Sequence, residues 1–360
     1  MKPAWKPNYT MTNKIINKLM RLESLRSITS GIPIASKISA KLKHEARLKS
    51  VHFSTRIEGN RLSLKQAKGV IDEDKRNLYG RERDVKEVQN YWNALIETER
   101  LANARTEFDE KLVKKIHSIV ETGSKTKPTP YRKEQNIIKD SSAGRIVYMP
   151  PEAKDVPGLM KKFTFWVRIA EKEKLPVPVI AALTHYQFVT IHPYYDGNGR
   201  TARLLSTFIL MKGNYGMDGM FSLEEYHAKN IEAYYRELTT HEHHNYYEGR
   251  ENADLTKWII YFLGVIEEAF VEFMDLANSY SSLTSGKNVQ LLKTLDRRAR
   301  EIYPLFELSE TIKTGDIARV LKIKNRMAAY LAQKWVKKGF LVSVGNSNKT
   351  RAYKLSSKYR

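Results

Sequence analysis

The most informative segment of this 360-residue chain is His192-Pro193-Tyr194-Tyr195-Asp196-Gly197-Asn198-Gly199-Arg200-Thr201-Ala202-Arg203. It follows a run whose apolar residues recur with helical spacing, and Pro193 is expected to end that helix. Gly197 and Gly199 allow tight turns and leave backbone N–H groups unobstructed. A second apolar helix is expected to begin near Arg200. The segment is therefore predicted to be a loop at a helix N-terminus, where free N–H groups bind an anion such as phosphate.

Four side chains of this segment add further parts of a phosphate-transfer site. Arg200 and Arg203 are one helical turn apart and are expected to place two positive charges on one face. Asp196 lies at the mouth of the loop, where a carboxylate can hold Mg²⁺. His192 precedes the loop and can take a proton. Each residue alone has a common structural explanation, but their combination within one short segment favours a catalytic site.

Another nucleotide-binding pattern also fits part of this segment. Gly197-x-Gly199-x-x-Ala202, with Asp218 about 20 residues further on, matches a dinucleotide fingerprint. That fingerprint requires a preceding strand within a βαβ unit, whereas the preceding segment here has helical spacing. The sequence also contains no Walker pattern, Gly-x4-Gly-Lys-Ser/Thr. We therefore reject both of these nucleotide-binding folds.

The segment resembles the signature of the Fic family, H-x-F-x-(D/E)-G-N-G-R-x-x-R. It departs from that signature at Tyr194, which replaces Phe. We expect Tyr194 to anchor the loop in the core and its hydroxyl to need a partner. The resemblance implies an enzyme that transfers AMP from Mg²⁺-ATP to a Ser, Thr or Tyr hydroxyl of a target protein, or of itself.

The resemblance also implies a role for each matching residue. His192 would be the base that deprotonates the acceptor hydroxyl, and Asp196 would bind Mg²⁺ between the phosphates. Asn198 and the loop amides would hold the α-phosphate, and the arginines the β- and γ-phosphates. The residues expected to bind ATP phosphates are Gly197, Asn198, Gly199, Arg200 and Arg203.

An upstream segment, Ser54-Thr-Arg-Ile-Glu58-Gly59-Asn60, resembles the inhibitory helix of the same family, (S/T)-x-x-x-E-(G/N). Ser54 and Glu58 are one helical turn apart and share a face. The resemblance implies that Glu58 pairs with Arg203 and displaces the γ-phosphate, so that Ser54, Glu58, Gly59 and Asn60 are regulatory. The alternative is an ordinary capped helix end.

Three further segments have a functional and a structural interpretation. Residues 134–149 are predicted to form a β-hairpin that resembles the family's flap and binds the target by strand addition; it could also be an ordinary surface hairpin. Tyr234 and Tyr235 are candidates for an adenine pocket, although tyrosines at helical spacing are more often core residues. His241-Glu242-His243-His244 lacks the H-E-x-x-H spacing of a zinc site, so no metal is assigned there.

The chain is expected to be mainly helical and to have three parts. Residues 1–107 would be an N-terminal helical region with the inhibitory helix, and residues 108–278 the Fic catalytic core with its hairpin flap. Residues 288–360 would be a C-terminal winged helix-turn-helix. Helices are predicted at 36–58, 63–72, 81–103, 108–121, 154–172, 176–191, 200–213, 223–239 and 253–278.

The C-terminal region differs from the rest in composition. After a Ser-rich stretch, Asn278 to Asn288, that is predicted to be a linker, residues 288–360 hold seventeen Lys/Arg and five Asp/Glu. The predicted order is helix (290–304), helix (314–321), helix (325–338) and a hairpin, which is typical of a winged helix. Lys324 and Arg326 would read a DNA groove, and Lys349 and Arg351 would contact phosphate. Winged helices also bind proteins, but the charge favours double-stranded DNA.

The composition limits the remaining choices. The net charge of +22 suits polyanionic partners, and the absence of cysteine excludes disulfides and zinc–thiolate sites. No apolar run is long enough for a membrane span and no signal peptide is visible, so a cytoplasmic location is expected.

The oligomeric state, with a homodimer as one option, stays open. Two other functions stay open as well: hydrolytic removal of AMP from a modified protein, and a DNA-binding regulator whose Fic core only senses nucleotide.

Overall fold

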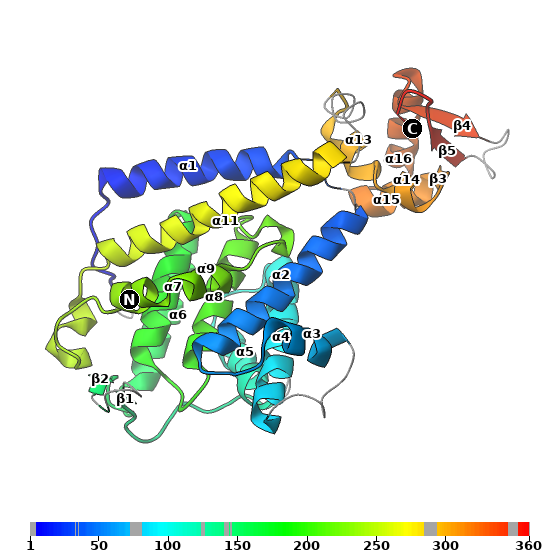
Figure 1. Cartoon of the computed structure of the whole chain (residues 1–360). Helices are drawn as coiled ribbons and strands as arrows, with labels where there is room; N and C mark the ends of the chain where they lie inside the picture. Colours follow the sequence, from blue (N-terminus) through cyan, green and yellow to red (C-terminus); the bar gives the residue numbers. More distant parts are fainter. Residues whose placement is uncertain are drawn as a thin grey trace. The chain divides into compact units, whose positions relative to one another are not determined.

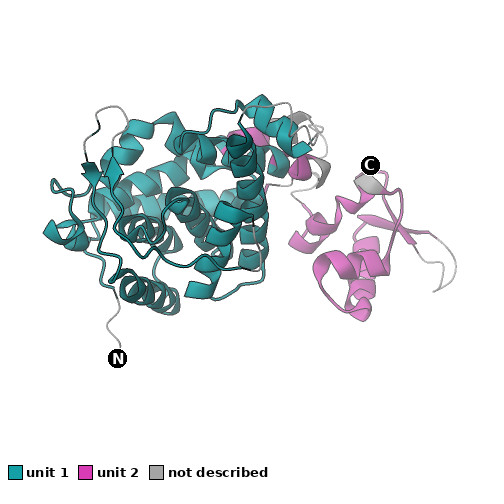
Figure 2. Ribbon diagram, turned by 90° about the horizontal axis from the view of Figure 1, so that it is seen from below, with its two compact units in different colours: residues 1–30, 43–272 teal, residues 31–42, 273–360 magenta. Residues whose placement is uncertain are grey.

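The computed structural model describes residues 5–32, 34, 36–72, 81–123, 127–139, 144, 146–283, 294–344 and 352–359. The chain divides into two compact units (Figure 2). Unit 1 comprises residues 1–30 and 43–272, and unit 2 comprises residues 31–42 and 273–360. No helix within the described ranges has the length and apolar character needed to cross a membrane.

Residues up to 283 are almost entirely helical, with one small hairpin (Figure 1). The elements are α1 (Asn13–Ser30), α2 (Ser36–Ile57), α3 (Leu64–Asp72), α4 (Glu82–Asn103), α5 (Glu110–Thr122), β1 (Ile138–Lys139), β2 (Ile146–Tyr148), α6 (Val156–Lys172), α7 (Val177–Ile191), α8 (Asn198–Lys212), η2 (Met217–Gly219), α9 (Leu223–Lys229), α10 (Ile231–Leu238), η3 (Tyr246–Glu248), η4 (Arg250–Asn252) and α11 (Thr256–Leu283).

Most predicted helices are present, and three differences have a local cause. The predicted helix 223–239 is two helices, because Asn230 leaves the helical conformation and its side chain caps α10 by accepting from the Ala233 N–H. The start of the predicted linker is wrong, since residues 278–283 still belong to α11; serine is tolerated in a helix that is already nucleated. Helix α1 was not predicted individually, although the region was expected to be helical.

Helix α7 forms the centre of unit 1. Nearly all of its residues are buried, because it has no polar face and packs between α6 and α8. Helix α8 also packs against α4 and α5. The loop between α7 and α8 is therefore attached at both ends to buried, well-packed helices, which fixes the position of its side chains.

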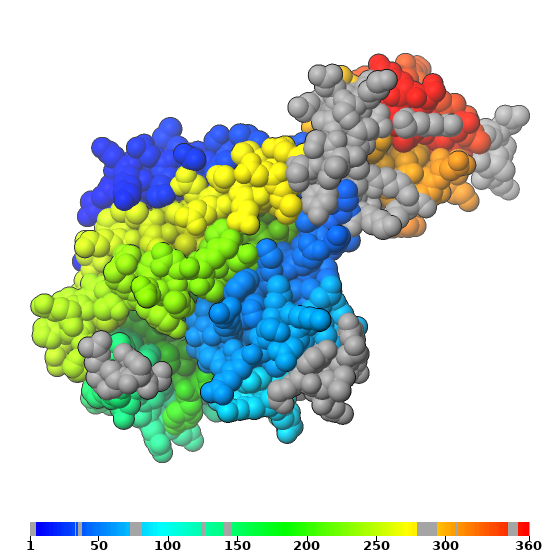
Figure 3. Space-filling view, viewed as in Figure 1, coloured from blue at the N-terminus to red at the C-terminus, as the bar shows by residue number. Residues whose placement is uncertain are grey.

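Helix α1 lies along the part of α11 that belongs to unit 1 (Figures 1 and 3). Lys18 and Arg21 of α1 pair with Glu267 of α11 at 2.8 and 2.6 Å. The N-terminal segment is thereby attached to the rest of unit 1.

Unit 2 ends in a small domain with its own core. Its elements are α13 (Arg297–Ile302), α14 (Leu305–Leu308), β3 (Ile312–Lys313), α15 (Thr314–Leu321), α16 (Asn325–Lys337), β4 (Leu341–Val344) and β5 (Ala352–Leu355), and the sheet order is β3-β5-β4. Trp335, Phe340 and Tyr353 are buried in this core. The helices predicted at 314–321 and 325–338 and the hairpin are present. Of the helix predicted at 290–304, residues 290–293 lie outside the described residues and only Arg297–Ile302 are helical, and α14 and β3 were not predicted. The winged-helix classification stays a prediction.

Candidate active site

The loop after α7 has the predicted position and begins at His192. The N–H of His192 closes α7 on the Phe188 carbonyl, and its backbone is left-handed with φ +50°. Gly197, with φ +75°, precedes the first residue of α8. A Cβ at Gly197 would lie 3.2 Å from His117 Nε2 and 3.3 Å from Glu121. Both its conformation and the close approach of α5 therefore require glycine there.

His192 is held so that one ring nitrogen stays available. Its Nδ1 lies 3.2 Å from the Val189 carbonyl oxygen. A carbonyl only accepts, so Nδ1 carries the proton and Nε2 keeps its lone pair. Burial lowers the pKa of His192 to about 4, although the Val189 bond and the charge of Glu58 oppose this shift. The imidazole is consequently neutral at pH 7 and able to accept a proton.

The side chains of Tyr194 and Asn198 hold the loop together rather than face a ligand. Asn198 donates from Nδ2 to the Tyr194 carbonyl (2.8 Å) and accepts the Tyr194 N–H (3.0 Å). The Tyr194 ring is buried and stacks on His117 with centroids 3.4 Å apart. Its buried hydroxyl has no hydrogen-bond partner within the described ranges, contrary to our expectation. Asn198 can therefore offer a phosphate its backbone N–H but not its amide side chain.

Asp196 is exposed at the mouth of the loop. Its Oδ1 accepts the Gly197 N–H at 2.6 Å and the Arg200 Nη2 at 3.0 Å. Burial alone would raise the pKa of Asp196, but the Arg200 charge and the Gly197 N–H outweigh it and hold the pKa below its usual value. The carboxylate is thus ionised, as a metal ligand must be.

The described residues contain no group of three or more His, Asp and Glu side chains that could hold a metal alone. This includes the segment around His241. Mg²⁺ is commonly bound by one or two carboxylates together with substrate phosphates. The exposed Asp196 fits that type of site, in which ATP supplies the remaining ligands.

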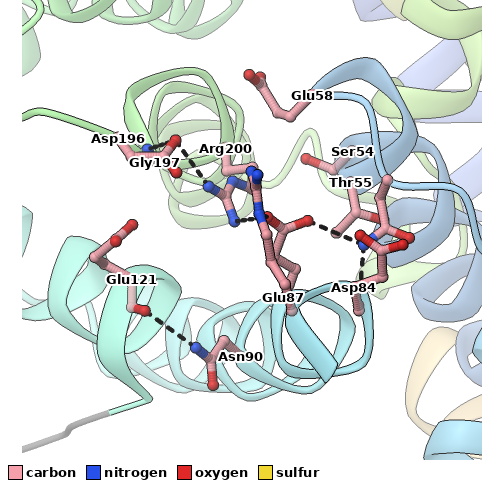
Figure 4. A network of polar contacts seen from close by, with 12 residues as sticks. Ser54, Thr55, Glu58, Asp84, Glu87, Asn90, Glu121, Asp196, Gly197 and Arg200 are labelled. Atoms are coloured by element: carbon pink, nitrogen blue, oxygen red, sulfur yellow. Dashed lines mark hydrogen bonds and ion pairs between the residues drawn. The ribbon is translucent and has the colours of Figure 1, made fainter. Parts of the chain in front are cut away.

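The two arginines of the loop are buried and point to different partners. Arg200 lies between Asp196 and Glu87 of α4, with Nη1 3.9 Å from Glu87 Oε1 (Figure 4). Arg203 reaches α2, where Nε donates to Ser54 Oγ (2.8 Å) and Nη2 donates to the Ser54 carbonyl (2.9 Å). We predicted that Arg200 and Arg203 place their charges on one face. In the structure they do not, because different groups hold the two guanidinium groups: Asp196 and Glu87 hold Arg200, and the end of α2 holds Arg203.

The predicted contact between Glu58 and Arg203 is present. Arg203 Nη2 donates to Glu58 Oε1 at 2.8 Å. The Glu58 carboxylate also covers the loop backbone, since a Cβ at Gly199 would lie 2.2 Å from Glu58 Oε1 and 3.3 Å from Arg203 Nη1. Burial would lower the pKa of Arg203, but the Glu58 charge raises it above its ordinary value. The Arg203 guanidinium therefore stays charged.

Unused donors mark where an anion can bind. Arg200 Nε and Arg203 Nη1 are buried without a hydrogen-bond partner in the described part of the chain. The first N–H groups of α8 have no acceptor within the helix. Guanidinium and backbone donors that converge on a glycine-rich turn fit phosphate groups.

The end of the Ser54–Asn60 segment is fixed by α4. Gly59 ends α2 with φ +91°. The buried Asn60 then donates from Nδ2 to the Asp84 carbonyl (2.9 Å) and to Glu87 Oε2 (3.0 Å). Sequence analysis missed Glu87, because no motif connects α4 with the loop.

The two tyrosines that were predicted to form an adenine pocket lie in different environments. Tyr234 is a core residue, and its hydroxyl bonds to the buried His185 Nε2 at 2.9 Å. It cannot contact a purine without repacking, so that assignment is wrong for Tyr234. Tyr235 is half exposed, and its hydroxyl donates to the Ile57 carbonyl at the end of α2 (3.4 Å). Only Tyr235 therefore offers an accessible ring beside the Ser54–Asn60 segment.

The hairpin is shorter than predicted and is tied to the loop. Strands β1 and β2 pair antiparallel, with Ile138 opposite Tyr148, and the turn at 140–143 lies outside the described residues. The Tyr195 hydroxyl accepts the N–H groups of Lys133 (3.1 Å) and Glu134 (3.2 Å). Residues just before the hairpin thus hold a residue of the signature segment.

Buried Arg132 attaches the residues before the hairpin to His192 and Pro193. Its Nε donates to the His192 carbonyl at 2.9 Å, and its backbone N–H donates to the Pro193 carbonyl at 2.9 Å. Nη2 donates to the Pro151 carbonyl on the far side of the hairpin. The hairpin and His192 therefore have fixed relative positions.

The Fic/DOC family model matches residues 107–210, which include α5 to most of α8. The protein adenylyltransferase Fic of Drosophila grimshawi is 28% identical over 198 residues, and that of Nematostella vectensis is 27% identical over 200 residues. Each alignment covers 55% of this chain but only 40% and 45% of the relative. The chain thus spans less than half the length of these curated relatives.

Two solved structures have a similar fold. A Fic family protein from Desulfovibrio desulfuricans G20 matches with a TM-score of 0.62 and 22% identity, covering 98% of this chain and 99% of that chain. Residues 134–508 of Fic-1 from C. elegans match with a TM-score of 0.56 and 20% identity, covering 74% and 73%. At these identities the likeness concerns the fold alone.

Proposed function

We propose that this chain, whose residues 107–210 form a Fic/DOC family domain, transfers AMP from ATP to a hydroxyl group of a target protein. The observation that carries the proposal is the loop between α7 and α8. It combines a neutral imidazole, an exposed ionised carboxylate and unused buried guanidinium donors. The names of the similar adenylyltransferases support the same reaction.

In the proposed reaction, His192 Nε2 takes the proton of the acceptor hydroxyl. The acceptor oxygen bonds to the α-phosphorus, and the bond from that phosphorus to the bridging oxygen breaks, so that pyrophosphate leaves. The α8 amides and the two arginines would hold the phosphates in line, since such reactions depend on positioning and charge neutralisation. Mg²⁺ bound at Asp196 would neutralise negative charge on the phosphates.

The acceptor would lie against the hairpin. Ile137, Ile146 and Val147 expose apolar side chains there. A target segment that adds to this hairpin as a strand would place its hydroxyl near His192. The exposed side chains favour targets with apolar residues beside the acceptor.

Glu58 would restrain the transfer. A γ-phosphate at Arg203 must compete with a carboxylate that already pairs with Nη2 at 2.8 Å. ATP bound without that contact would present its α-phosphate out of line with the hydroxyl, and a small misplacement costs much rate. Hydrolytic removal of AMP, with Glu58 orienting a water molecule, is the alternative activity of the same site.

The test is incorporation of α-labelled ATP into lysate proteins and into the chain itself. Glu58→Gly should raise incorporation at least about tenfold, because a change of only ~1.4 kcal/mol suffices. Adding His192→Ala should lower it again by about 10² or more. Arg56→Gly, at an exposed position of the same helix end, controls for added flexibility and should resemble the wild type.

The outcomes separate the activities. Equal incorporation by wild type and Glu58→Gly, in an active preparation, would mean that residues 54–60 are only a helix end. Free AMP released from a modified target by the wild type, and lost in Glu58→Gly without any gain in transfer, would establish hydrolysis instead.

We also propose that the C-terminal domain binds double-stranded DNA. Residues 317–360 contain twelve Lys/Arg and no Asp/Glu. Upstream acidic residues are used within the fold: Asp296 caps α13 and accepts from Trp335, and Asp316 caps α15. Helix α16 has the size of a groove-reading helix and exposes a largely polar face. Its exposed residues are Asn325, Arg326, Met327, Tyr330, Gln333, Lys334 and Lys337. Lys349 and Arg351 lie outside the described residues.

The test uses the full chain and duplex DNA of mixed sequence at several salt concentrations. Arg326→Glu with Lys334→Glu should weaken binding by about tenfold or more and flatten the salt dependence. Arg297→Glu with Arg298→Glu makes the same charge change on α13 and serves as the matched control. Equal effects of both pairs would indicate non-specific attraction, and no binding at low salt would favour a protein ligand.

A further inference from the structure

Glu87 is a buried carboxylate that contacts both regulatory and phosphate-binding segments. Its Oε2 accepts from Asn60 Nδ2 at 3.0 Å, directly after the Glu58–Gly59 turn. Its Oε1 accepts from Arg83 Nε at 2.8 Å and lies 3.9 Å from Arg200 Nη1. Figure 4 shows the Arg200 guanidinium between Glu87 on one side and Asp196 on the other. Only 8% of Glu87 is exposed, so its charge is poorly screened by water.

Arg200 needs a carboxylate partner in either state of the site. Its side chain is 2% exposed, and a buried guanidinium without a counter-charge is strongly destabilising. At present Asp196 Oδ1 supplies the closer partner at 3.0 Å. That same carboxylate is the group that faces solvent and can bind a cation. Asp196 therefore has two competing uses, and Glu87, 3.9 Å from Arg200 Nη1, is a second carboxylate that Arg200 can pair with.

We propose that Glu87 is a positioning residue that takes over Arg200 when Asp196 binds the metal. The proposal rests on the function proposed above. In this exchange Arg200 moves from Asp196 toward Glu87, and Asp196 Oδ1 becomes free. The bond from Asn60 holds Glu87 Oε2 and so limits how strongly Glu87 can attract Arg200. The end of the inhibitory segment would thus influence the metal site through Asn60 and Glu87, independently of the Glu58–Arg203 pair.

Two neighbouring groups do not take this role. Glu121 of α5 faces the loop near Gly197, and burial together with the charge of Asp196 raises its pKa. No ion pair joins Glu121 to Arg200 among the described residues, whereas Glu87 Oε1 lies 3.9 Å from Arg200 Nη1. Arg83 is largely exposed and reaches Glu87 from solvent, so it can follow Glu87 without fixing it.

The experiment measures how much metal strengthens nucleotide binding. The dissociation constant of α,β-methylene-ATP is determined by calorimetry with Mg²⁺ and with EDTA, and the metal effect is the ratio of the two constants. All variants are made on Glu58→Gly, where the γ-phosphate has no competitor. Glu87→Gln keeps the shape of the side chain and should reduce the metal effect by about fivefold or more. Asn60→Ala releases Glu87 and should increase it.

Opposite changes in these two variants distinguish the exchange from a structural role, since loss of packing would alter both in the same direction. Glu82→Gln removes an exposed carboxylate from the same helix and should leave the metal effect unchanged. Thermal unfolding of each variant verifies that it is folded, and Asn60→Ala remains informative if Glu87→Gln is not.

Asp196→Asn identifies which proposal fails. If it leaves the metal effect intact, the assignment of Asp196 is wrong, and the exchange at Glu87 is overturned with it. If Asp196→Asn abolishes the metal effect while Glu87→Gln and Asn60→Ala match their parent, only the role of Glu87 is overturned.

Discussion

At the residue scale, His192 has a neutral imidazole, as the proposed role of base requires. The carbonyl of Val189 fixes the proton on Nδ1, and burial lowers the pKa of the ring to about 4. The charge of Glu58 works against that shift, so Glu58→Gly should lower the pKa further. The imidazole is protonated only below its pKa and therefore stays a competent base throughout the neutral range.

This predicts the pH dependence of transfer. In Glu58→Gly at saturating Mg²⁺-ATP, the initial rate should lose no activity to His192 protonation between pH 8 and 5.5. An acid limb should appear only near pH 4. Circular dichroism at each pH would verify that the protein is folded. A limb near 6.5, the ordinary value for histidine, would contradict the proposed environment of His192.

The positions of single residues could be predicted where residues close in sequence determine the geometry. The 192–203 segment and the Ser54–Asn60 pattern predicted the exposed position of Asp196 and the contact between Glu58 and Arg203, because spacing along one helix or loop fixes which residues lie together. Glu87 was missed and the contacts of Arg132 were not predicted, since the partners of both residues come from distant segments and only tertiary packing joins them. The side chain of Asn198 was predicted to face phosphate. Instead its amide group forms hydrogen bonds with the carbonyl and the N–H of Tyr194.

At the scale of elements, the strong periodicity of apolar residues predicted the helices well. The weak local signals in the sequence did not predict where a helix is interrupted. Helices α7 and α8 follow from long apolar patterns. The break at Asn230 was missed because asparagine is tolerated inside a helix as well as at a cap. Strand β3 has only two residues and shows no period. It forms because the edge of β5 is available to pair with it.

The hairpin shows how an element that was predicted in outline acquires its position. Alternation and the turn residues indicated two strands, but nothing in that pattern indicated their attachment to the loop. Tyr195 and Arg132 supply it, with bonds that join residues 132–134 to the signature segment. A hairpin held this way can present a target segment to His192 in a defined register.

At the scale of the whole molecule, the ionisable groups are unevenly divided. All nine histidines lie between residues 44 and 244, which places them in unit 1. Burial lowers the pKa of His117 to about 4 and of His227 to about 3, and it lowers that of His185 as well. Unit 2 contains no histidine. Its basic surface therefore keeps its charge across the range in which unit 1 takes up protons on unfolding.

The sign of the effect follows from linkage. A histidine with a lowered folded pKa is neutral in the fold and takes up a proton on unfolding, so stability is lost as pH falls below about 6.5. For each fully buried imidazole, the free energy of unfolding of unit 1 should fall by on the order of 1 to 2 kcal/mol between pH 7.5 and 5. The raised pKa of Glu121 opposes this loss at one site only.

The two units should consequently respond differently to acid. Hydrogen exchange of the full chain at pH 7.5 and 5.0, corrected for intrinsic rates, would report the opening free energy of each core. Protection should fall in α7 and α8 and stay unchanged around Trp335. His227→Gln should reduce the loss in unit 1, because it removes a group that takes up a proton on unfolding. His244→Gln, at an exposed position, is the matched control and should not reduce it. Equal losses in both units would mean that acid acts through surface charge, since only unit 1 has imidazoles to protonate.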